Sequence, residues 1–185
     1  MAVAQRMSEA DYVEFVNSGV DGVWELHDGR LVEKPGMSWS HGDIITKLLV
    51  LLFQQLDRTE YHVFTELRVR RPSATIFLPD LMVVPTAYGE PFRDRPVLAI
   101  FSDPLPLVVE IWSPSTGEYD VDTKAPVYMQ RGDLEIWRIH PYERTLTRWV
   151  RQPDGAYDES VHRDGTIALA ALPSVTIDLD ALLAG

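Results

Sequence analysis

The spacing of hydrophobic and polar positions predicts two helices near the start of the chain. Ser8 and Asp11 form an N-cap pair that begins a short helix, and Gly19 ends it. Ser40 and Asp43 are expected to cap a second helix in the same way. The apolar positions of this second helix form the wide stripe of a helix that packs on a core: Ile44, Ile45, Leu48, Leu49, Leu51, Leu52 and Leu56.

Strand-like runs fill most of the remaining chain. The dipeptide Asp28-Gly29 lies between two such runs and strongly favours a two-residue β-hairpin. The run 105–112 is the most continuously apolar, which predicts a central strand covered on both faces. The strands are expected at residues 23–27, 30–33, 61–70, 75–84 with an interruption at Pro79, 105–112, and then, as antiparallel strands, 134–140, 145–151, 156–162 and 175–177.

Two segments between these strands carry other signals. Residues 85–104 are rich in Pro, Asp and Arg, which indicates a long loop with room for a helical turn. Residues 122–131 form a predicted helix that Gly132 ends, and Pro126 is compatible with it because it falls close to the first turn. The order of helix, hairpin, helix, strands, helix and strands predicts an α+β or mixed α/β fold.

Length and composition indicate one soluble domain over residues 1–185. The hydrophobic fraction of 45% and the charged fraction of 24% are ordinary for a soluble protein. The longest apolar run, residues 48–53, is far shorter than the roughly 20 residues of a membrane-spanning helix. The N-terminal segment lacks the apolar core of a signal peptide, and the absence of cysteine excludes disulfides and thiolate metal sites. We therefore expect a cytoplasmic protein with no membrane partner.

The acidic balance of the chain limits how it could bind nucleic acid. A formal net charge of −11 argues against broad, sequence-independent binding to a polyanion. Any such contact would be local, through Arg68, Arg70 and Arg71 or through Arg93 and Arg95. The alternative is that these arginines form a solvated strand end and a polar loop.

Asp80 and Glu110 are the most informative acidic residues. Asp80 follows Pro79 where an apolar strand is broken, and Glu110 lies inside the almost wholly apolar run 107–112. An unpaired buried carboxylate is costly, so Glu110 needs a cation, a network of donors or a proton. Two carboxylates that converge from neighbouring strands suit Mg²⁺ or Mn²⁺, and the main-chain carbonyl of Ile111 could add a ligand. The alternative places Glu110 at a strand end, paired with an arginine.

Three further residues could take part in the same chemistry. Lys124 is one of only three lysines, against 14 arginines, and its ammonium could orient a water or offset charge on a phosphate. His41, at the start of the second helix, could contact phosphate or transfer a proton. Glu25 alternates with Trp24 and Leu26, so the pattern leaves its face open. Taken alone, each of the three is more often a structural or solvated residue.

Other chemistry-bearing patterns are absent from the sequence. It contains no GxSxG, Walker A, GxGxxG or HExxH motif. The tryptophans at positions 112, 137 and 149 fit strand packing better than base stacking. The remaining histidines show no metal-ligand spacing: His27, His62, His140 and His162.

Several sequence segments occur in the same order as in the proteins of a known family. They are WELHDG at 24–29, Ser40-His41, Pro79-Asp80, VEIWSPST at 109–116, the D-x-x-x-K-x-x-x-Y pattern from Asp120 through Lys124 to Tyr128, and 132–141. This series resembles the Uma-type family of restriction-endonuclease-like proteins, a branch of the PD-(D/E)XK nuclease superfamily. The resemblance extends from about Met7 to Leu183.

The resemblance implies a restriction-endonuclease-like mixed central sheet flanked by helices, with an antiparallel C-terminal extension. It implies that one catalytic site is lined by Glu25, His41, Asp80, Glu110 and Lys124. Position 112, where the ExK arrangement has its lysine, is Trp, so Lys124 would fill that role from the following helix. The implied metal ligands are Asp80, Glu110 and Ile111, with Mg²⁺ or Mn²⁺ as the cofactor. The departures from the family pattern remove none of these ligands: Trp24 for Tyr, Trp112 for Leu, His140 for Asp, and Pro126 inside the helix.

These observations lead to two hypotheses. In the first, the chain is a metal-dependent endonuclease that hydrolyses DNA, with Asp80 and Glu110 on the metal, Lys124 orienting the water and His41 near the phosphate. Glu25 would be a third carboxylate on the metal or one that supports the ligands from behind. In the second, it is a catalytically inactive interaction or nucleic-acid-binding module on the same fold, which the acidic charge favours. We also expect a homodimer, because a lone acidic domain offers little surface for DNA.

Overall fold

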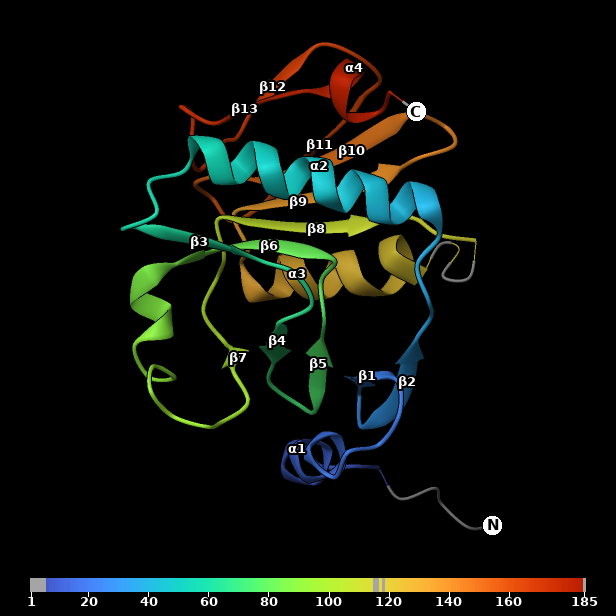
Figure 1. The fold of residues 1–185 in the computed structure, drawn as a ribbon, viewed down its shortest axis with the longest axis vertical. Helices are drawn as coiled ribbons and strands as arrows, with labels where there is room; N and C mark the ends of the chain where they lie inside the picture. Colours follow the sequence, from blue (N-terminus) through green and yellow to red (C-terminus); the bar gives the residue numbers. More distant parts are fainter. Residues whose placement is uncertain (1–5, 115–116, 118, 185) are drawn as a thin grey trace.

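Two β-sheets form the centre of the molecule, which the computed structural model describes for residues 6–114, 117 and 119–184 (Figure 1). The six-stranded sheet has the order β11-β10-β9-β8-β6-β3, and the five-stranded sheet has the order β2-β1-β5-β4-β7. The larger sheet comprises β3 (Tyr61–Phe64), β6 (Leu81–Pro85), β8 (Leu107–Ile111), β9 (Glu135–His140), β10 (Thr145–Arg151) and β11 (Tyr157–His162). The smaller comprises β1 (Val23–His27), β2 (Arg30–Lys34), β4 (Arg68–Arg71), β5 (Thr75–Phe77) and β7 (Ile100–Phe101).

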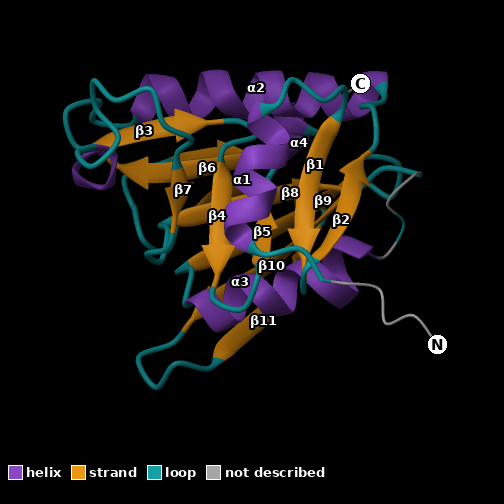
Figure 2. Ribbon diagram, turned by 90° about the horizontal axis from the view of Figure 1, so that it is seen from below, coloured by secondary structure: helices purple, strands orange, loops and turns teal. Residues whose placement is uncertain are grey.

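Helices cover both sheets. In Figure 1, α2 and α3 lie on opposite faces of the six-stranded sheet, and in Figure 2 α1 crosses the five-stranded sheet. The short strands β12 and β13 pair with each other near α4. The helical segments are α1 (Glu9–Asn17), α2 (Trp39–Gln55), the turn η1 (Thr86–Gly89), the π-helical turn η2 (Asp120–Lys124), α3 (Ala125–Arg131) and α4 (Leu179–Leu182), and the last strands are β12 (Thr166–Ala168) and β13 (Thr176–Asp178). No helix in the described part of the chain is long and apolar enough to cross a membrane.

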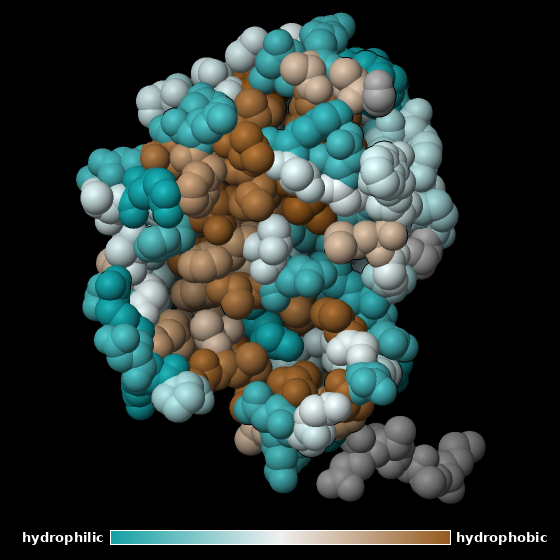
Figure 3. Space-filling view, in the orientation of Figure 1, coloured by the Kyte–Doolittle hydropathy of each residue, from teal (hydrophilic) through white to brown (hydrophobic). Residues whose placement is uncertain are grey.

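The central strands are buried on both faces, and alternation decides which helix each side chain meets. In β6, Leu81 and Val83 belong to the core on the α2 side, whereas Met82 belongs to the core on the α3 side. In β8, Val109 faces α2 in the same way, so its neighbour Glu110 faces α3. Figure 3 shows that apolar side chains also gather on the outer surface, in a band that runs from the level of α2 down past the level of β3.

The β1–β2 hairpin places two charged residues on one face. Asp28 and Gly29 have positive φ angles of 46° and 78°, which a two-residue hairpin turn of this type requires at both central positions. Glu25 pairs with Val32, and Lys34 lies two residues further along β2. Because successive side chains alternate between faces, Glu25, Val32 and Lys34 point the same way.

Most of the predicted elements are confirmed, and so is the mixed α+β fold with helices on both faces. The capping box of Ser8 and Asp11 is present, and Gly132 ends α3 in a left-handed conformation with φ 82°. The predicted cap at Ser40 is wrong: Ser38 accepts the hydrogen bond from the main-chain N of His41, so the helix begins two residues earlier.

Three other details differ from the sequence prediction. The single strand expected at 61–70 is two strands in different sheets, because the chain turns at Glu66, which has a φ of 56°. Strand β9 is antiparallel to β10 as predicted, but on its other side it pairs in parallel with β8. The short elements β7, β12 and α4 were not predicted, since segments of two to four residues give no measurable periodicity.

Candidate active site

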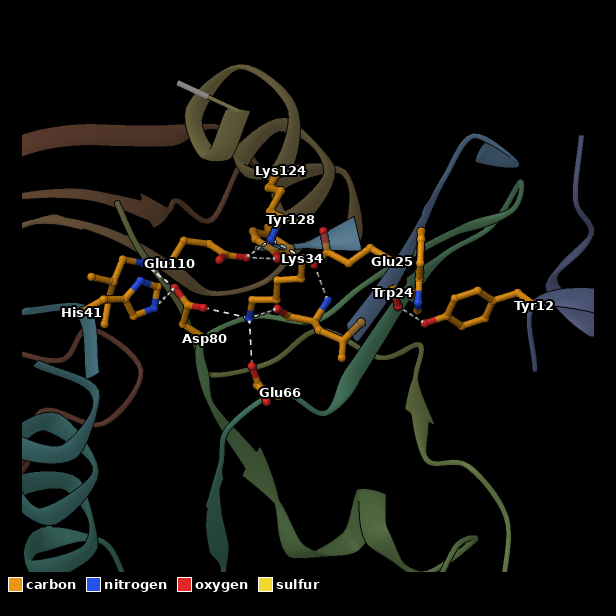
Figure 4. Close-up of polar contacts among 12 residues, drawn as sticks. Tyr12, Trp24, Glu25, Lys34, His41, Glu66, Asp80, Glu110, Lys124 and Tyr128 are labelled. Carbon is orange, nitrogen blue, oxygen red and sulfur yellow. Dashed lines mark hydrogen bonds and ion pairs between the residues drawn. The ribbon is translucent and has the colours of Figure 1, made fainter. Parts of the chain in front are cut away.

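A cavity of about 260 Å³ lies where the two sheets meet, and its polar lining consists mainly of paired charges (Figure 4). Each structural layer contributes to it: the β1–β2 hairpin, the first turn of α2, the start of β6, the end of β8, and η2 before α3. The charged and imidazole side chains at its centre are Glu25, Lys34, His41, Asp80, Glu110 and Lys124, all of them buried or nearly so.

Asp80 is contacted on both of its carboxylate oxygens. Its Oδ1 lies 2.8 Å from Nζ of Lys34, while its Oδ2 accepts a 2.7 Å hydrogen bond from the main-chain N of Ile111 and lies 3.1 Å from Nε2 of His41. Burial alone would raise the pKa of Asp80, but the Lys34 ammonium and His41 outweigh it, so the pKa lies well below the usual range of an aspartate. Asp80 is therefore held as a carboxylate at neutral pH.

Lys34 extends from the end of β2 into the same cluster. Besides Asp80, its Nζ donates a 2.9 Å hydrogen bond to the carbonyl of Leu78 and lies 3.7 Å from Oε1 of Glu66 (Figure 4). Burial lowers the pKa of Lys34, but the attraction of Asp80 and Glu110 is larger, and the net shift is upward. Lys34 is thus a buried ammonium whose strongest partner is Asp80.

On the α3 side of the sheet, the buried Glu110 contacts both a cation and a hydrogen-bond donor. Its Oε1 accepts a 2.5 Å hydrogen bond from the hydroxyl of Tyr128 and lies 3.2 Å from Nζ of Lys124. Lys124 and Tyr128 are four residues apart at the junction of η2 and α3, which places them on one helical face. The pairing partner is a lysine, so the alternative of a strand-end arginine does not describe this contact.

Glu25 ties the smaller sheet to the larger one. Its Oε1 lies 2.9 Å from Nζ of Lys124 and accepts a 2.8 Å hydrogen bond from the main-chain N of Leu78. The Lys124 ammonium therefore bridges Glu25 from the five-stranded sheet and Glu110 from the six-stranded sheet. Its side chain is only 3% exposed, so this bridge is shielded from bulk solvent.

The donor set of the cavity fits a hard divalent cation in a limited way. Carboxylate and carbonyl oxygens are the ligands that Mg²⁺ and Mn²⁺ prefer, and Mg²⁺ is commonly held by one or two carboxylates plus water and phosphate. In the described part of the chain, no three His, Asp or Glu side chains are grouped so as to hold a metal ion. A metal held by Asp80 and Glu110 would thus depend on the main chain, water and substrate for its remaining ligands.

The structure brings together all five side chains that the sequence singled out. Glu25, His41, Asp80, Glu110 and Lys124 line the one cavity, together with Ile111. Their catalytic and metal-binding roles stay predictions. Ser115 and Thr116 of the VEIWSPST segment lie outside the described residues.

Lys34 is the site residue that sequence reasoning missed. Two signals could have indicated it: lysine is rare in this chain, and the hairpin register puts Lys34 on the face of Glu25. Neither signal says that this face meets Asp80, because that contact depends on how the two sheets pack.

The arginines that were candidates for nucleic-acid contact are engaged within the protein. Arg68 donates to the hydroxyl of Tyr12, Arg70 contacts Glu9 and Ser102, and Arg71 contacts Asp28 and Gln130. On the long loop, Arg93 pairs with Glu90 and Arg95 donates to the carbonyl of Pro91. These contacts favour the alternative of a structural strand end and a polar loop.

Comparisons with known proteins agree on the fold. A crystal structure from Anabaena variabilis, titled as a "putative nuclease belonging to DUF820", superposes with a TM-score of 0.75 at 19% identity, covering 92% of this chain and 95% of that one. At this identity the likeness concerns the fold alone. A search of curated proteins finds no match. The model of the Uma2 family, described as "Putative restriction endonuclease", matches residues 10–180, and the chain therefore belongs to the Uma2 family.

Proposed function

We propose that this protein is a metal-dependent endonuclease that hydrolyses phosphodiester bonds in DNA. The observation that carries the proposal is the convergence of Asp80, Glu110 and Lys124 on one buried cavity in a member of a restriction-endonuclease-like family. A fold alone does not determine a function, so the argument depends on these side chains and their contacts.

The carboxylates of Asp80 and Glu110 and the carbonyl of Ile111 would hold Mg²⁺ or Mn²⁺. The main-chain N–H of Ile111 donates to Asp80, and in an extended strand the C=O of a residue points to the same side as its N–H. This supports Ile111 as the third oxygen donor. When bound, such an ion lowers the pKa of a coordinated water and neutralises charge on the phosphate.

The protein's own groups would position the reactants. Lys124 is held between Glu25 and Glu110, so its ammonium has a fixed place from which to orient the attacking water. Tyr128 fixes Glu110 through its hydroxyl, and His41 lies beside Asp80 at the start of α2, where a phosphate oxygen would be favoured. Each charged group is pre-oriented by a neighbour, as a site that stabilises a transition state requires.

The DNA contact in this proposal is narrow. The candidate arginines at positions 68, 70 and 71 contact Tyr12, Glu9 and Asp28, so these three cations are engaged within the protein. We therefore expect weak, strongly local binding whose affinity depends little on salt, because few counterions are released. Titration of binding against salt concentration checks this directly.

Nicking of supercoiled plasmid in the presence of Mn²⁺ tests the function. The wild-type protein should convert supercoiled to open-circular DNA, and EDTA should abolish the conversion. Asp80→Asn and Lys124→Met should lose it, while Asp57→Asn, a matched neutralisation at an exposed loop carboxylate, should not. Equal behaviour of all four proteins, extended to single-stranded DNA and RNA, would contradict the proposal and favour the inactive binding module.

Assembly is a separate part of the proposal. A homodimer would double the limited surface that an acidic chain with net charge −11 presents to DNA. Gel filtration with light scattering should give the mass of two chains of 21.0 kDa each. Elution at the mass of one chain would contradict it without affecting the nuclease proposal.

A further inference from the structure

Lys34 occupies a position that matters for any cation at Asp80. Its Nζ lies 2.8 Å from Oδ1 of Asp80, whereas Ile111 and His41 contact the other carboxylate oxygen, Oδ2. Both carboxylate oxygens of Asp80 are therefore engaged within the protein. A divalent ion bound to Oδ1 would lie close to the Lys34 ammonium, which is 2.8 Å from the same oxygen, so repulsion between the two cations makes them compete for it.

The surroundings of Lys34 also show where its ammonium can go. Its other partners are the carbonyl of Leu78 at 2.9 Å and the carboxylate of Glu66 at 3.7 Å, and Glu66 is 41% exposed (Figure 4). A lysine has a flexible four-carbon stem and makes no directional demand on its partner. It can leave Asp80 for Glu66 or for a phosphate in the cavity without becoming an unpaired buried charge.

We propose that Lys34 is an internal counter-ion that competes with the divalent metal for Asp80, an inference that rests on the proposed function. Metal binding at Asp80 then requires the ammonium to move off Oδ1. The protein alone binds metal weakly, and a bound phosphate, which attracts the displaced Lys34, strengthens metal binding. Lys34 is a positioning residue in this scheme, because it acts through Asp80.

Metal affinity without DNA gives the primary test. Free Mn²⁺ is followed by electron paramagnetic resonance during titration of the wild type, Lys34→Met and Lys47→Met, the last a matched change at a partly exposed lysine paired with Asp43. Lys34→Met should bind Mn²⁺ at least tenfold more tightly than the wild type, and Lys47→Met should match the wild type. The double variant Lys34→Met/Asp80→Asn should lose the gain, which locates it at Asp80. Equal or weaker binding by Lys34→Met overturns the inference.

A second measurement uses the wild-type protein and does not depend on the folding of a variant. The chain has three lysines, so reductive methylation followed by peptide mass spectrometry reports each one separately. At a Mn²⁺ concentration that saturates the wild type, methylation of Lys34 should rise severalfold while that of Lys47 stays constant. Unchanged or reduced methylation of Lys34 overturns the inference.

The outcomes separate this inference from the nuclease proposal. If plasmid nicking occurs but Lys34→Met gains no affinity, the inference fails and the function stands. If Lys34→Met binds Mn²⁺ more tightly at Asp80 but neither the wild type nor any variant nicks a substrate, the inference stands and the function fails. If no protein binds Mn²⁺ at all, both fail.

Discussion

Two clusters of buried charge in this molecule have similar chemistry but different surroundings. One is the cavity cluster around Asp80, Glu110 and Lys124. The other joins Arg131, at the end of α3, to Asp133, with 3.0 Å between Nε and Oδ2. The first lines a cavity of about 260 Å³, whereas Arg131 and Asp133 contact each other and the main chain of neighbouring segments.

The partners of the arginine cluster identify it as structural. Besides Asp133, Arg131 donates to the carbonyls of Phe101 at 3.0 Å, Asp103 at 2.9 Å and Arg70. Asp133 in turn accepts a 2.8 Å hydrogen bond from the main-chain N of Leu105. Every one of these contacts fixes a loop or strand end. In the cavity cluster, by contrast, charged side chains mostly contact one another.

The two aspartates also differ in the direction of their pKa shifts. Burial raises the pKa of Asp133, and the single Arg131 does not reverse it, because that guanidinium is shared with three carbonyls. Two cations and His41 instead hold the pKa of Asp80 below its usual range. Burial of an acid therefore says little about function. The number of cations directed at it, and the presence of space beside it, say more.

The largest expected effect on stability is at the cluster of Arg131 and Asp133. Arg131→Met would remove the cation beside Asp133 and the donor to three main-chain carbonyls, so the free energy of unfolding should fall by about 3–5 kcal/mol. Urea denaturation measures this loss. Nicking per folded molecule should be unchanged, since Arg131 does not line the cavity. A stability loss below about 1 kcal/mol would remove the distinction between the clusters.

Lys124→Met should give the opposite balance of effects. Nicking should fall by about 10²–10³-fold, as when one pre-oriented electrostatic group is removed from an active site. The free energy of unfolding should fall by only about 1–2 kcal/mol, because water entering the cavity can solvate Glu25 and Glu110. If urea denaturation shows a loss as large as that of Arg131→Met, the cavity cluster is structural as well.

A matched pair of tyrosines sharpens the comparison at smaller scale. The hydroxyl of Tyr128 donates to the carboxylate of Glu110, and that of Tyr157 donates to the main-chain oxygen of Asp133 at 2.6 Å. Tyr128→Phe should weaken Mn²⁺ binding and nicking and cost about 1.5–3 kcal/mol of stability, because its acceptor is charged. Tyr157→Phe should cost about 0.5–1.5 kcal/mol and leave both activities alone. Indistinguishable metal titrations of the two variants would contradict this assignment.

The smallest expected effect is a pH dependence from Tyr157. Burial, followed by the charge of Asp133, raises the pKa of Tyr157 to about 12 from an ordinary 10.0. Because the folded-state pKa is the higher one, the stabilising contribution is complete below pH 10.0 and is lost as the pH rises towards about 12. The stability difference between wild type and Tyr157→Phe should shrink over that interval in urea titrations. A constant difference would mean that the hydroxyl does not titrate there.

The features that could be predicted well from the sequence are those that depend on patterns of neighbouring residues. The hairpin followed from Asp28-Gly29, the face of α2 from its apolar stripe, and the central position of β8 from its unbroken apolar run. Glu110 stood out because a carboxylate within such a run demands a partner. These signals need only a few neighbouring residues, so they survive without knowledge of the tertiary structure.

What could not be predicted depends on packing between distant segments. Lys34 and Asp80 are 46 residues apart in the chain, and they meet only because the two sheets pack together at this point. The parallel pairing of β8 with β9 and the split of the 61–70 strand at Glu66 likewise follow from long-range topology. The choice of Ser38 over Ser40 as the α2 cap was undecidable locally, since either serine can accept the capping hydrogen bond.

The hairpin turn has a consequence for anyone who wishes to move this site into another scaffold. Asp28 and Gly29 fix the pairing of Glu25 with Val32, and that pairing aims both Glu25 and Lys34 at the cavity. One residue inserted in the turn would reverse the side-chain alternation of β2 and send Lys34 to the opposite face. A transplanted site must therefore include the hairpin turn as well as the acidic strands and Lys124, although the side chains of the turn do not line the cavity.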